Sequence, residues 1–337
     1  MLGKMVKKTI FLLLLTGAAQ AQQVYSDLSG QPDGLLQFHS VTPRTRYELA
    51  HRSYPPQPTV IQGTLAMPTR GQPPYPAMVL AHGSGGIQRK DWERWVPLLR
   101  RLGIATFVVD SFTTRKIGTT IDDQAQLDQS ANDADALSAL KLLASDPRID
   151  PARIGVMGFS RGGIVALETA NEYFRRGVID TGLRFAAHIA FYPGCSLRYW
   201  RTPSPMTGAP IMMALAGADD YTPARPCIAY GETMRAAGQD IEIHVYQEAL
   251  HDFDNFNLRP VYHPSGQTQR NCPDREIDPA SWEYRLLASG QTFRDLPSFS
   301  AAIGRCASTG VTTGGNRAAA AQAEADVQAF LARVLKP

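Results

Sequence analysis

The sequence ARIGVMGFSRGGIVALETA, residues 152–170, is the strongest indication of the fold that we expect for this chain. Its β-branched and apolar run at 154–157 predicts a short strand, and the amphipathic pattern at 163–174 predicts a helix. Between them lies the pattern G-x-S-x-G, with Ser160 at its centre. A serine on a sharp turn from strand to helix is typical of a catalytic nucleophile, and this context argues against a chance match.

The glycines of this motif have a steric explanation. Gly158 and Gly162 stand two residues before and after Ser160, where a tight turn crowds the backbone. The helix that follows directs its first N–H groups toward the serine, where they can stabilise a developing negative charge. The turn is therefore predicted to have a strained backbone and to present N–H donors to the reacting group.

Other segments alternate between strand and helix patterns. We expect strands at 59–67, 77–81, 104–109, 154–157, 185–191, 211–216 and 242–246, the last strand of the chain. Residues 47–50 are a candidate first strand. Helices are expected at 91–102, 123–144, 163–174, 223–237 and 318–335. This alternation predicts an α/β fold with a mostly parallel, doubly wound sheet and helices on both faces. Ligand sites of such sheets lie at the carboxyl ends of the strands.

One long segment interrupts this pattern. Residues 252–315 are rich in Pro, Gly, Asn and Gln, and predict an irregular insertion within a single domain spanning 22–337. Long loops in compact domains are usually functional. Both a lid over the site and a structural collar without substrate contact remain open.

The four cysteines lie in the C-terminal half of the chain. Four cysteines allow three pairings, and disulfides are favoured over free thiols in an exported protein. Cys195 and Cys227 each follow a predicted strand, whereas Cys272 and Cys306 share the irregular segment. We therefore expect the disulfides Cys195–Cys227 and Cys272–Cys306. No Cys/His spacing indicates a metal site.

The first 21 residues resemble a signal peptide. A lysine-rich start precedes a short apolar run, and Ala19-Gln20-Ala21 offers a cleavage site, so we expect a periplasmic or secreted protein. The apolar run is too short to span a bilayer, and no integral membrane association is expected. The full chain carries a net charge of +3, and this segment holds three lysines and no acid, so the remainder is formally neutral. A neutral chain gives no reason to expect nucleic-acid binding.

An acid and a histidine are expected after the serine in chain order. Asp219 and Asp220 follow the predicted strand 211–216, and His251 lies in the loop after the last predicted strand. Of the two acids, Asp219 is favoured and Asp220 is the alternative, although either could instead cap the following helix. The remaining histidines lie within strands or away from the expected sheet edge, and His82 is expected to shape a turn.

These residues predict a mechanism. His251 would take the proton of Ser160 as the hydroxyl attacks a carbonyl, and Asp219 would orient and stabilise the imidazole. The N–H groups of Ser84 and Arg161 are the candidate oxyanion hole. Ser84 belongs to His-Gly-Ser-Gly-Gly at 82–86, which matches neither nucleotide-binding pattern. No metal or organic cofactor is expected.

The segments VLAHGSGG, VVDSF, GFSRGG, GADDYTPA and YQEALHDFDNF together resemble the dienelactone hydrolase family of α/β-hydrolases. The resemblance covers roughly residues 60–335, and the C-terminal GVTTGGNRAAAAQAEADVQAFL is similar to exported bacterial members. It implies an α/β-hydrolase fold and ester hydrolysis. The enzymes that gave the family its name use a cysteine nucleophile, whereas this chain has Ser160, so the resemblance does not imply a dienelactone substrate.

The sequence therefore predicts an exported serine hydrolase that cleaves carboxylic esters of small molecules through an acyl-enzyme. A peptidase or amidase with the same triad is an alternative within enzymes. A catalytically silent binding protein on this fold is the alternative outside them, because a fold alone does not establish activity.

Overall fold

The computed structural model describes residues 23–87, 89–199, 205–304 and 306–336. The predicted signal peptide, residues 1–21, lies outside the described residues. None of the helices within the described ranges combines the length and apolar character of a membrane span.

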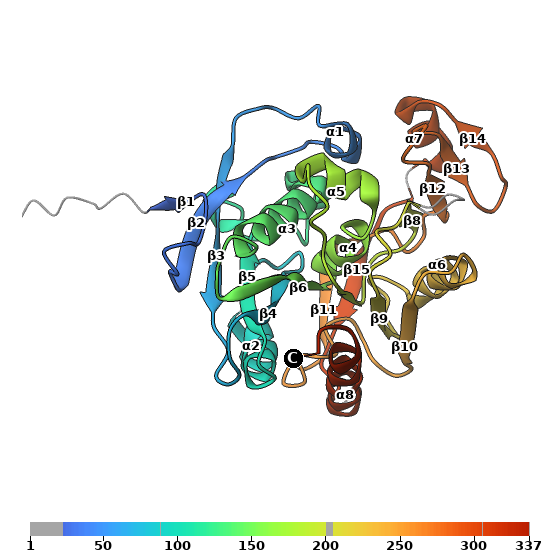
Figure 1. The fold of residues 1–337 in the computed structure, drawn as a ribbon. Coiled ribbons are helices and arrows are strands. Elements are labelled where there is room, and N and C mark those ends of the chain that lie inside the picture. The colour runs from blue at the N-terminus through green and yellow to red at the C-terminus, as the bar shows by residue number, and fades with distance from the viewer. Residues whose placement is uncertain (1–22, 88, 200–204, 305, 337) are drawn as a thin grey trace, which may run out of the picture.

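A nine-stranded sheet forms the centre of the molecule (Figure 1). Its spatial order is β1-β2-β3-β5-β4-β6-β7-β9-β10. The strands are β1 (Val24–Tyr25), β2 (Gly34–Ser40), β3 (Thr59–Ala66), β4 (Tyr75–Ala81), β5 (Ala105–Asp110), β6 (Ile149–Phe159), β7 (His188–Phe191), β9 (Ile211–Ala216) and β10 (Ile241–Tyr246). From β5 to β10 all neighbours are parallel, so the carboxyl ends of these strands meet at one edge. The α/β-hydrolase fold is thus as predicted.

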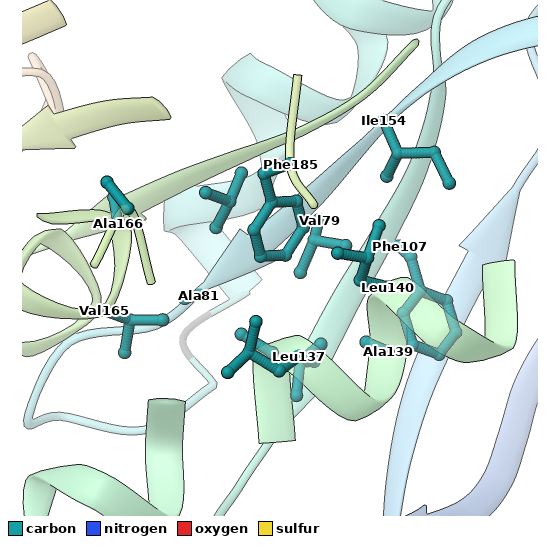
Figure 2. Close-up of a cluster of buried hydrophobic side chains, with 14 of the residues drawn as sticks. Val79, Ala81, Phe107, Leu137, Ala139, Leu140, Ile154, Val165, Ala166 and Phe185 are labelled. Atoms are coloured by element: carbon teal, nitrogen blue, oxygen red, sulfur yellow. The ribbon is translucent and has the colours of Figure 1, made fainter. Parts of the chain in front are cut away.

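Helices cover both faces of the sheet. On one face lie α2 (Arg89–Arg101) and α8 (Arg317–Val334), which bury Trp95 and Phe330 against the strands. On the other lie α3 (Gln129–Leu143), α4 (Arg161–Glu168) and α6 (Ala224–Ala236). Figure 2 shows Leu137 and Leu140 of α3 packed near Val79 and Phe107 of the sheet. Burial of such side chains stabilises the sheet by about 1.5–3 kcal/mol each.

Two predictions near the N-terminus were wrong or incomplete. Residues 47–50, predicted as a possible strand, belong to α1 (Arg46–His51). Thr45 caps this helix by accepting a hydrogen bond from the backbone N–H of Glu48, and Leu49 is fully buried. A capped turn with a single buried apolar residue is too short to show helical periodicity in the sequence. Strands β1 and β2 were not predicted.

Two predicted helices were also wrong in extent. The helix predicted at 163–174 is divided into α4 and α5 (Glu172–Val178), because Asn171 accepts a hydrogen bond from Tyr173 N and so starts a new helix. The helix predicted from residue 123 begins only at Gln129, after a 3-10 turn at Gln124–Gln126.

Residues 252–315 carry more regular structure than predicted, and β10 is not the last strand. An antiparallel pair is formed by β11 (Val261–Thr268) and β15 (Ser308–Thr313). A small separate sheet has the order β14-β13-β12-β8, with β8 (Leu197–Arg198), β12 (Arg275–Ile277), β13 (Tyr284–Leu286) and β14 (Thr292–Phe293), and α7 (Leu296–Ile303) beside it. Its parallel pairing of β12 with β8 attaches the segment to the main domain.

Both disulfides that the sequence favours are present. Cys195 is bonded to Cys227, and Cys272 is bonded to Cys306. The first joins the loop after β7 to α6, whereas the second closes the 252–315 segment on itself. Each therefore fixes a segment that lies beyond the carboxyl edge of the sheet.

Candidate active site

Ser160 occupies the turn between β6 and α4, at the carboxyl edge of the sheet. Its backbone has φ 55° and ψ −112°, a conformation that costs an L-residue free energy and persists only where the surroundings enforce it. The N–H of Ser160 donates to the carbonyl of Phe191 in β7 at 3.0 Å. The turn is thereby held against the neighbouring strand, with the serine side chain at its tip.

The prediction that Gly158 and Gly162 must be small is confirmed. A Cβ atom at Gly158 would lie 1.9 Å from the carbonyl oxygen of Gly162. A Cβ atom at Gly162 would lie 2.0 Å from the carbonyl oxygen of Ala81, at the end of β4. Both contacts are with backbone atoms, which cannot rotate away. The two glycines therefore allow α4 to begin directly against the sheet.

His251 lies in the loop after β10 and faces Ser160. Its Nε2 is 2.8 Å from Ser160 Oγ, and its imidazole is almost completely buried. The rings of Tyr192 and Tyr221 flank it, with centroid distances of 4.6 and 4.7 Å. The carbonyl of His251 also accepts a hydrogen bond from Gly314 N, so the segment after β15 supports this loop. These contacts restrict the imidazole to one orientation.

Asp219 is the acid on the far side of the imidazole. Its Oδ2 lies 2.7 Å from His251 Nδ1, and its Oδ1 accepts hydrogen bonds from the N–H groups of Tyr221 and Thr222, both at 2.8 Å. The hydroxyl of Thr222 lies 3.1 Å from Asp219 Oδ2 and also 3.1 Å from His251 Nδ1. The structure thus brings together Ser160, His251 and Asp219 in one chain of hydrogen bonds.

The alternative acid, Asp220, is placed elsewhere. Its carboxylate accepts hydrogen bonds from the backbone N–H of Thr312 at 2.7 Å and from the Thr312 hydroxyl at 3.0 Å. Thr312 belongs to β15, so this contact joins the loop after β9 to the 252–315 segment. Asp220 does not contact His251. Of the two adjacent acids, Asp219 is paired with His251 and Asp220 anchors the 252–315 segment.

Opposing effects act on the pKa of His251. Burial lowers it, but the charge of Asp219 and the hydrogen bond to it raise it, and the nearby Asp252 and Asp254 add to this. The net result is a pKa above the usual value of 6.5. Burial also raises the pKa of Asp252 and Asp254. The negative environment therefore favours a positive charge on this imidazole.

The predicted oxyanion donors lie beside the serine. Arg161 is the first residue of α4, so its N–H has no acceptor within the helix. Ser84 follows Gly83, where a Cβ atom would lie 3.3 Å from Ser160 Cβ, so the loop passes directly over the turn. No described residue accepts a hydrogen bond from Ser84 N. Both N–H groups are thus available near Ser160 Oγ.

Gln124 is a residue of this site that the sequence did not indicate. Its Oε1 accepts hydrogen bonds from Ser84 Oγ at 3.0 Å and from the Arg161 guanidinium at 3.1 Å. Its Nε2 donates to Tyr221 Oη at 3.3 Å. Gln124 therefore connects the loop at Ser84, the helix after Ser160 and the loop that carries Asp219. Since it stands in a polar turn without a recognisable motif, no local signal could have identified it.

Asp254 is a second residue that the sequence analysis missed. It is buried, and it accepts hydrogen bonds from Trp95 Nε1 at 2.7 Å and Tyr192 Oη at 2.5 Å. Tyr192 in turn packs against His251. The carboxylate thus supports the loop that carries the histidine. A buried role for the second aspartate of His-Asp-Phe-Asp could not be read from the sequence, because it depends on α2.

His82 holds the turn over the serine, as expected. Its Nδ1 lies 2.8 Å from the carbonyl of Gly83, and its Nε2 accepts a hydrogen bond from Ser111 N at 3.2 Å. Burial lowers its pKa below the usual value, which keeps the ring neutral for these contacts.

The described residues include no group of three or more His, Cys, Asp or Glu side chains arranged to hold a metal ion.

A large cavity opens beside Ser160. Its volume is about 1050 Å³, and Ser84, Arg161 and Tyr221 line its inner end. Its walls combine apolar surface with polar side chains, among them several arginines and glutamines, and include the disulfide cysteines Cys195 and Cys272. A cavity of this size is at the upper end of the range for small-molecule sites. The serine therefore faces a space that can hold a sizeable molecule.

The chain is similar to a known protein family and to several solved structures. The model of the dienelactone hydrolase family matches residues 61–271. The apo form of esterase 2 from Thermogutta terrifontis is 20% identical, with 59% of this chain and 82% of that chain covered and a TM-score of 0.47. A dienelactone hydrolase-like promiscuous phosphotriesterase from metagenomic libraries is 18% identical, with 66% and 85% covered and a TM-score of 0.45. No curated protein matches the sequence significantly.

Proposed function

The chain belongs to the dienelactone hydrolase family of α/β-hydrolases, and from this premise we propose that it is an exported serine esterase that cleaves small-molecule carboxylic esters. Membership of the family makes it a hydrolase. The observation that carries the finer proposal is the chain of hydrogen bonds from Ser160 through His251 to Asp219, with distances of 2.8 and 2.7 Å. The two disulfides support an oxidising compartment.

The first half of the reaction forms an acyl-enzyme. His251 Nε2 takes the proton of the Ser160 hydroxyl while Oγ attacks the carbonyl carbon of the ester. Asp219 accepts the hydrogen bond from Nδ1–H and stabilises the imidazolium. The imidazolium then protonates the leaving alkoxide, the carbon–oxygen bond breaks, and the acyl group remains on Ser160. The raised pKa of His251 suits this transient positive charge.

The tetrahedral intermediates carry an oxyanion. The N–H groups of Arg161 and Ser84 are its proposed donors, and the positive end of α4 points at the same position. One such donor is worth roughly 10²–10³ in rate. In the second half, His251 removes a proton from water, the resulting hydroxide attacks the acyl carbon, and Ser160 leaves with the proton returned by His251.

The direct test uses p-nitrophenyl esters of graded acyl length with the mature protein and with Ser160→Ala. We expect the wild type to hydrolyse them and Ser160→Ala to lose a factor of about 10⁴–10⁶ in kcat, since the triad acts as a unit. Thermal unfolding of the two proteins should coincide, because the hydroxyl supports no other part of the fold. A Ser160→Ala protein with full activity would exclude the proposed centre.

A fluorophosphonate probe separates an inactive enzyme from a silent binding protein. The probe should label the wild type at Ser160 and leave Ser160→Ala unlabelled. Labelling without hydrolysis of any ester would point to amide substrates instead. Absence of labelling in a folded wild-type protein would favour the binding protein.

A further inference from the structure

Three arginines converge on the cavity beyond Ser160, and two of them, Arg161 and Arg275, are hydrogen-bonded only to neutral oxygens among the described residues. Arg46, Arg161 and Arg275 all line it. Arg46 lowers the pKa of both other guanidinium groups by repulsion, in addition to the larger effect of burial, and that of Arg161 falls to about 10. Such repulsion between buried charges is unfavourable unless an anion balances it.

Neither Arg161 nor Arg275 is hydrogen-bonded to a carboxylate among the described residues. Arg161 donates to Asn132 Oδ1 at 2.9 Å and to oxygens of Gln124 and Leu127, all of them neutral. The guanidinium of Arg275 likewise donates to neutral oxygens, those of Ser196, Pro273 and Gln269. The nearby Asp274 already lies within ion-pair distance of Arg198 and Arg225. Both buried cations thus keep charge that no neighbouring carboxylate neutralises directly.

Arg46 offers free donors to the cavity. Its Nε donates to both oxygens of Glu168 at 3.0 and 2.9 Å, and its guanidinium lies 5.7 Å from the ring centre of Tyr199. These contacts fix the plane of the group. Its two Nη atoms have no hydrogen-bond partner among the described residues, although the side chain is largely buried. A planar pair of unused N–H donors matches the geometry of a carboxylate.

Burial lowers the pKa of Arg46, but nearby acids raise it above its usual value, and the hydrogen-bonded acid, Glu168, uses only Nε. Glu168 supplies one negative charge, and Asp128, which caps α3, supplies another. Burial and the proximity of Glu168 raise the pKa of Asp133 well above its usual range, which weakens the negative charge that this carboxyl offers to the arginines. None of these carboxylates is hydrogen-bonded to an Nη atom of Arg46 among the described residues.

The position of Arg46 sets a distance from the reacting group. Glu168 is eight residues after Ser160 along α4, a rise of about 12 Å. The guanidinium held by Glu168 is therefore on the order of 10 Å from the serine. Arg46 and Arg275 also lie outside residues 61–271, the part of the chain that matches the family. This part of the cavity is thus supplied by the flanking segments of this particular chain.

We propose that Arg46, with Arg161 and Arg275 beside it, binds a carboxylate at the far end of the substrate, remote from the ester that Ser160 attacks. The substrate class is then an ester whose acyl chain ends in an acid group on the order of 10 Å from the scissile carbonyl. This inference rests on the proposed esterase function. It adds that the enzyme selects for charge at a distance, with Arg46 as the specificity-determining residue.

The test compares two series of p-nitrophenyl esters. One series consists of half-esters of linear dicarboxylic acids from succinic to sebacic, and the other of monocarboxylic esters of matched length. We expect kcat/KM to favour the acid-ended member by roughly ten- to a hundred-fold, which is the range for a charge-assisted contact, once the chain is long enough to reach Arg46. The short members should show little preference. Equal rates for the two series at every length would overturn the proposal.

Variants assign the preference to Arg46. Arg46→Gln should reduce the ratio of acid-ended to neutral kcat/KM at least tenfold, and Arg46→Lys should retain part of it. Arg52→Gln is the matched control, because Arg52 follows α1 and pairs with Asp180 away from this cavity. It should leave the ratio and the neutral rate unchanged. An unaltered ratio in a folded Arg46→Gln protein would contradict the assignment.

One further measurement needs no variant. Free azelate should inhibit hydrolysis of a neutral ester by the wild type competitively, and added NaCl should weaken this inhibition. Lack of inhibition would count against the proposed site even if Arg46→Gln failed to fold. Failure of the esterase proposal is distinguishable, because then neutral esters would not be hydrolysed through Ser160 at all.

Discussion

The two ends of the cavity are built in different ways. The reacting end is made by the turn after β6 and by short loops after β4, β9 and β10, all of them within the residues that match the family. The arginine end includes Arg46 from α1 and Arg275 from β12, which lie on either side of that region. The reacting end depends on local backbone geometry, whereas the arginine end depends on distant segments that meet only in the folded chain. The catalytic chemistry of the reacting end and the substrate selectivity of the arginine end can therefore change independently of each other.

The largest effect that tests this contrast comes from two adjacent acids. Asp219→Asn should reduce kcat by about 10³–10⁴, because the imidazole of His251 would lose its orienting acceptor and the stabilisation of its charge. Asp220→Asn should leave kcat within a factor of a few and lower the free energy of unfolding by about 1 kcal/mol, through its contact with Thr312. Steady-state kinetics and chemical unfolding of both variants provide the measurement.

These two substitutions can also contradict the assignment of Asp219 as the catalytic acid. The two residues are neighbours with the same side chain, so each is the control for the other. If Asp220→Asn were the inactive variant, the assignment of the acid to the reacting end would be wrong.

A second contrast concerns two glycines, one in the turn at Ser160 and one in the 252–315 segment. Gly162→Ala should destabilise the protein by about 3 kcal/mol or more, because the new Cβ would lie 2.0 Å from the backbone oxygen of Ala81. Gly266→Ala in β11 should cost less, about 1–2 kcal/mol, since its Cβ would meet the side chain of the buried Val311 at 2.7 Å. A side chain can move by a few tenths of an ångström more readily than the backbone of β4 can.

Thermal and urea unfolding of both glycine variants measure the difference. A similar, small loss of stability in both would mean that the turn at Ser160 is more adaptable than its close contacts indicate. A large loss of stability in Gly266→Ala would instead mean that the 252–315 segment is packed as rigidly as the sheet.

Much of the fold could be predicted from local patterns. Strands such as β9, which is fully buried and apolar, and the long helix α8 have strong periodicity or composition. The segments that were missed are short, or are stabilised by partners distant in the sequence. Residues 47–50 form a helix because Leu49 packs under α5, and β12 exists because it pairs with β8. Neither partner is visible in the local sequence.

The proposed catalytic residues could be named from the sequence because the fold fixes where such residues stand. Ser160, Asp219 and His251 stand at fixed places relative to strands, so that chain order limits the choice. Gln124, Asp254 and Arg46 carry no such mark, because their roles arise from contacts with elements far away along the chain. The choice between Asp219 and Asp220 also had to await the structure, since only β15 explains where the second acid points.

The smallest expected effect is a displacement of the acidic limb of the pH–rate profile. His251 must be neutral to accept the proton of Ser160, so activity is lost as the pH falls through the pKa of His251. Because Asp219, Asp252 and Asp254 raise that pKa despite burial, the midpoint of kcat/KM should lie above 6.5.

The same shift has the opposite sign for stability. A raised pKa in the folded state means that the folded protein binds the proton more tightly than the unfolded chain does. This contribution to the free energy of unfolding is complete below pH 6.5 and is lost as the pH rises through the raised pKa. Activity should therefore increase over the pH interval in which this stabilisation declines.

Profiles of kcat/KM for a neutral ester and of unfolding free energy against pH, measured on the wild type and Asp220→Asn, check both signs. Since Asp220 does not contact His251, the two proteins should share one midpoint. A midpoint below 6.5, or one displaced by Asp220→Asn, would show that the titration is not governed by the reacting end alone.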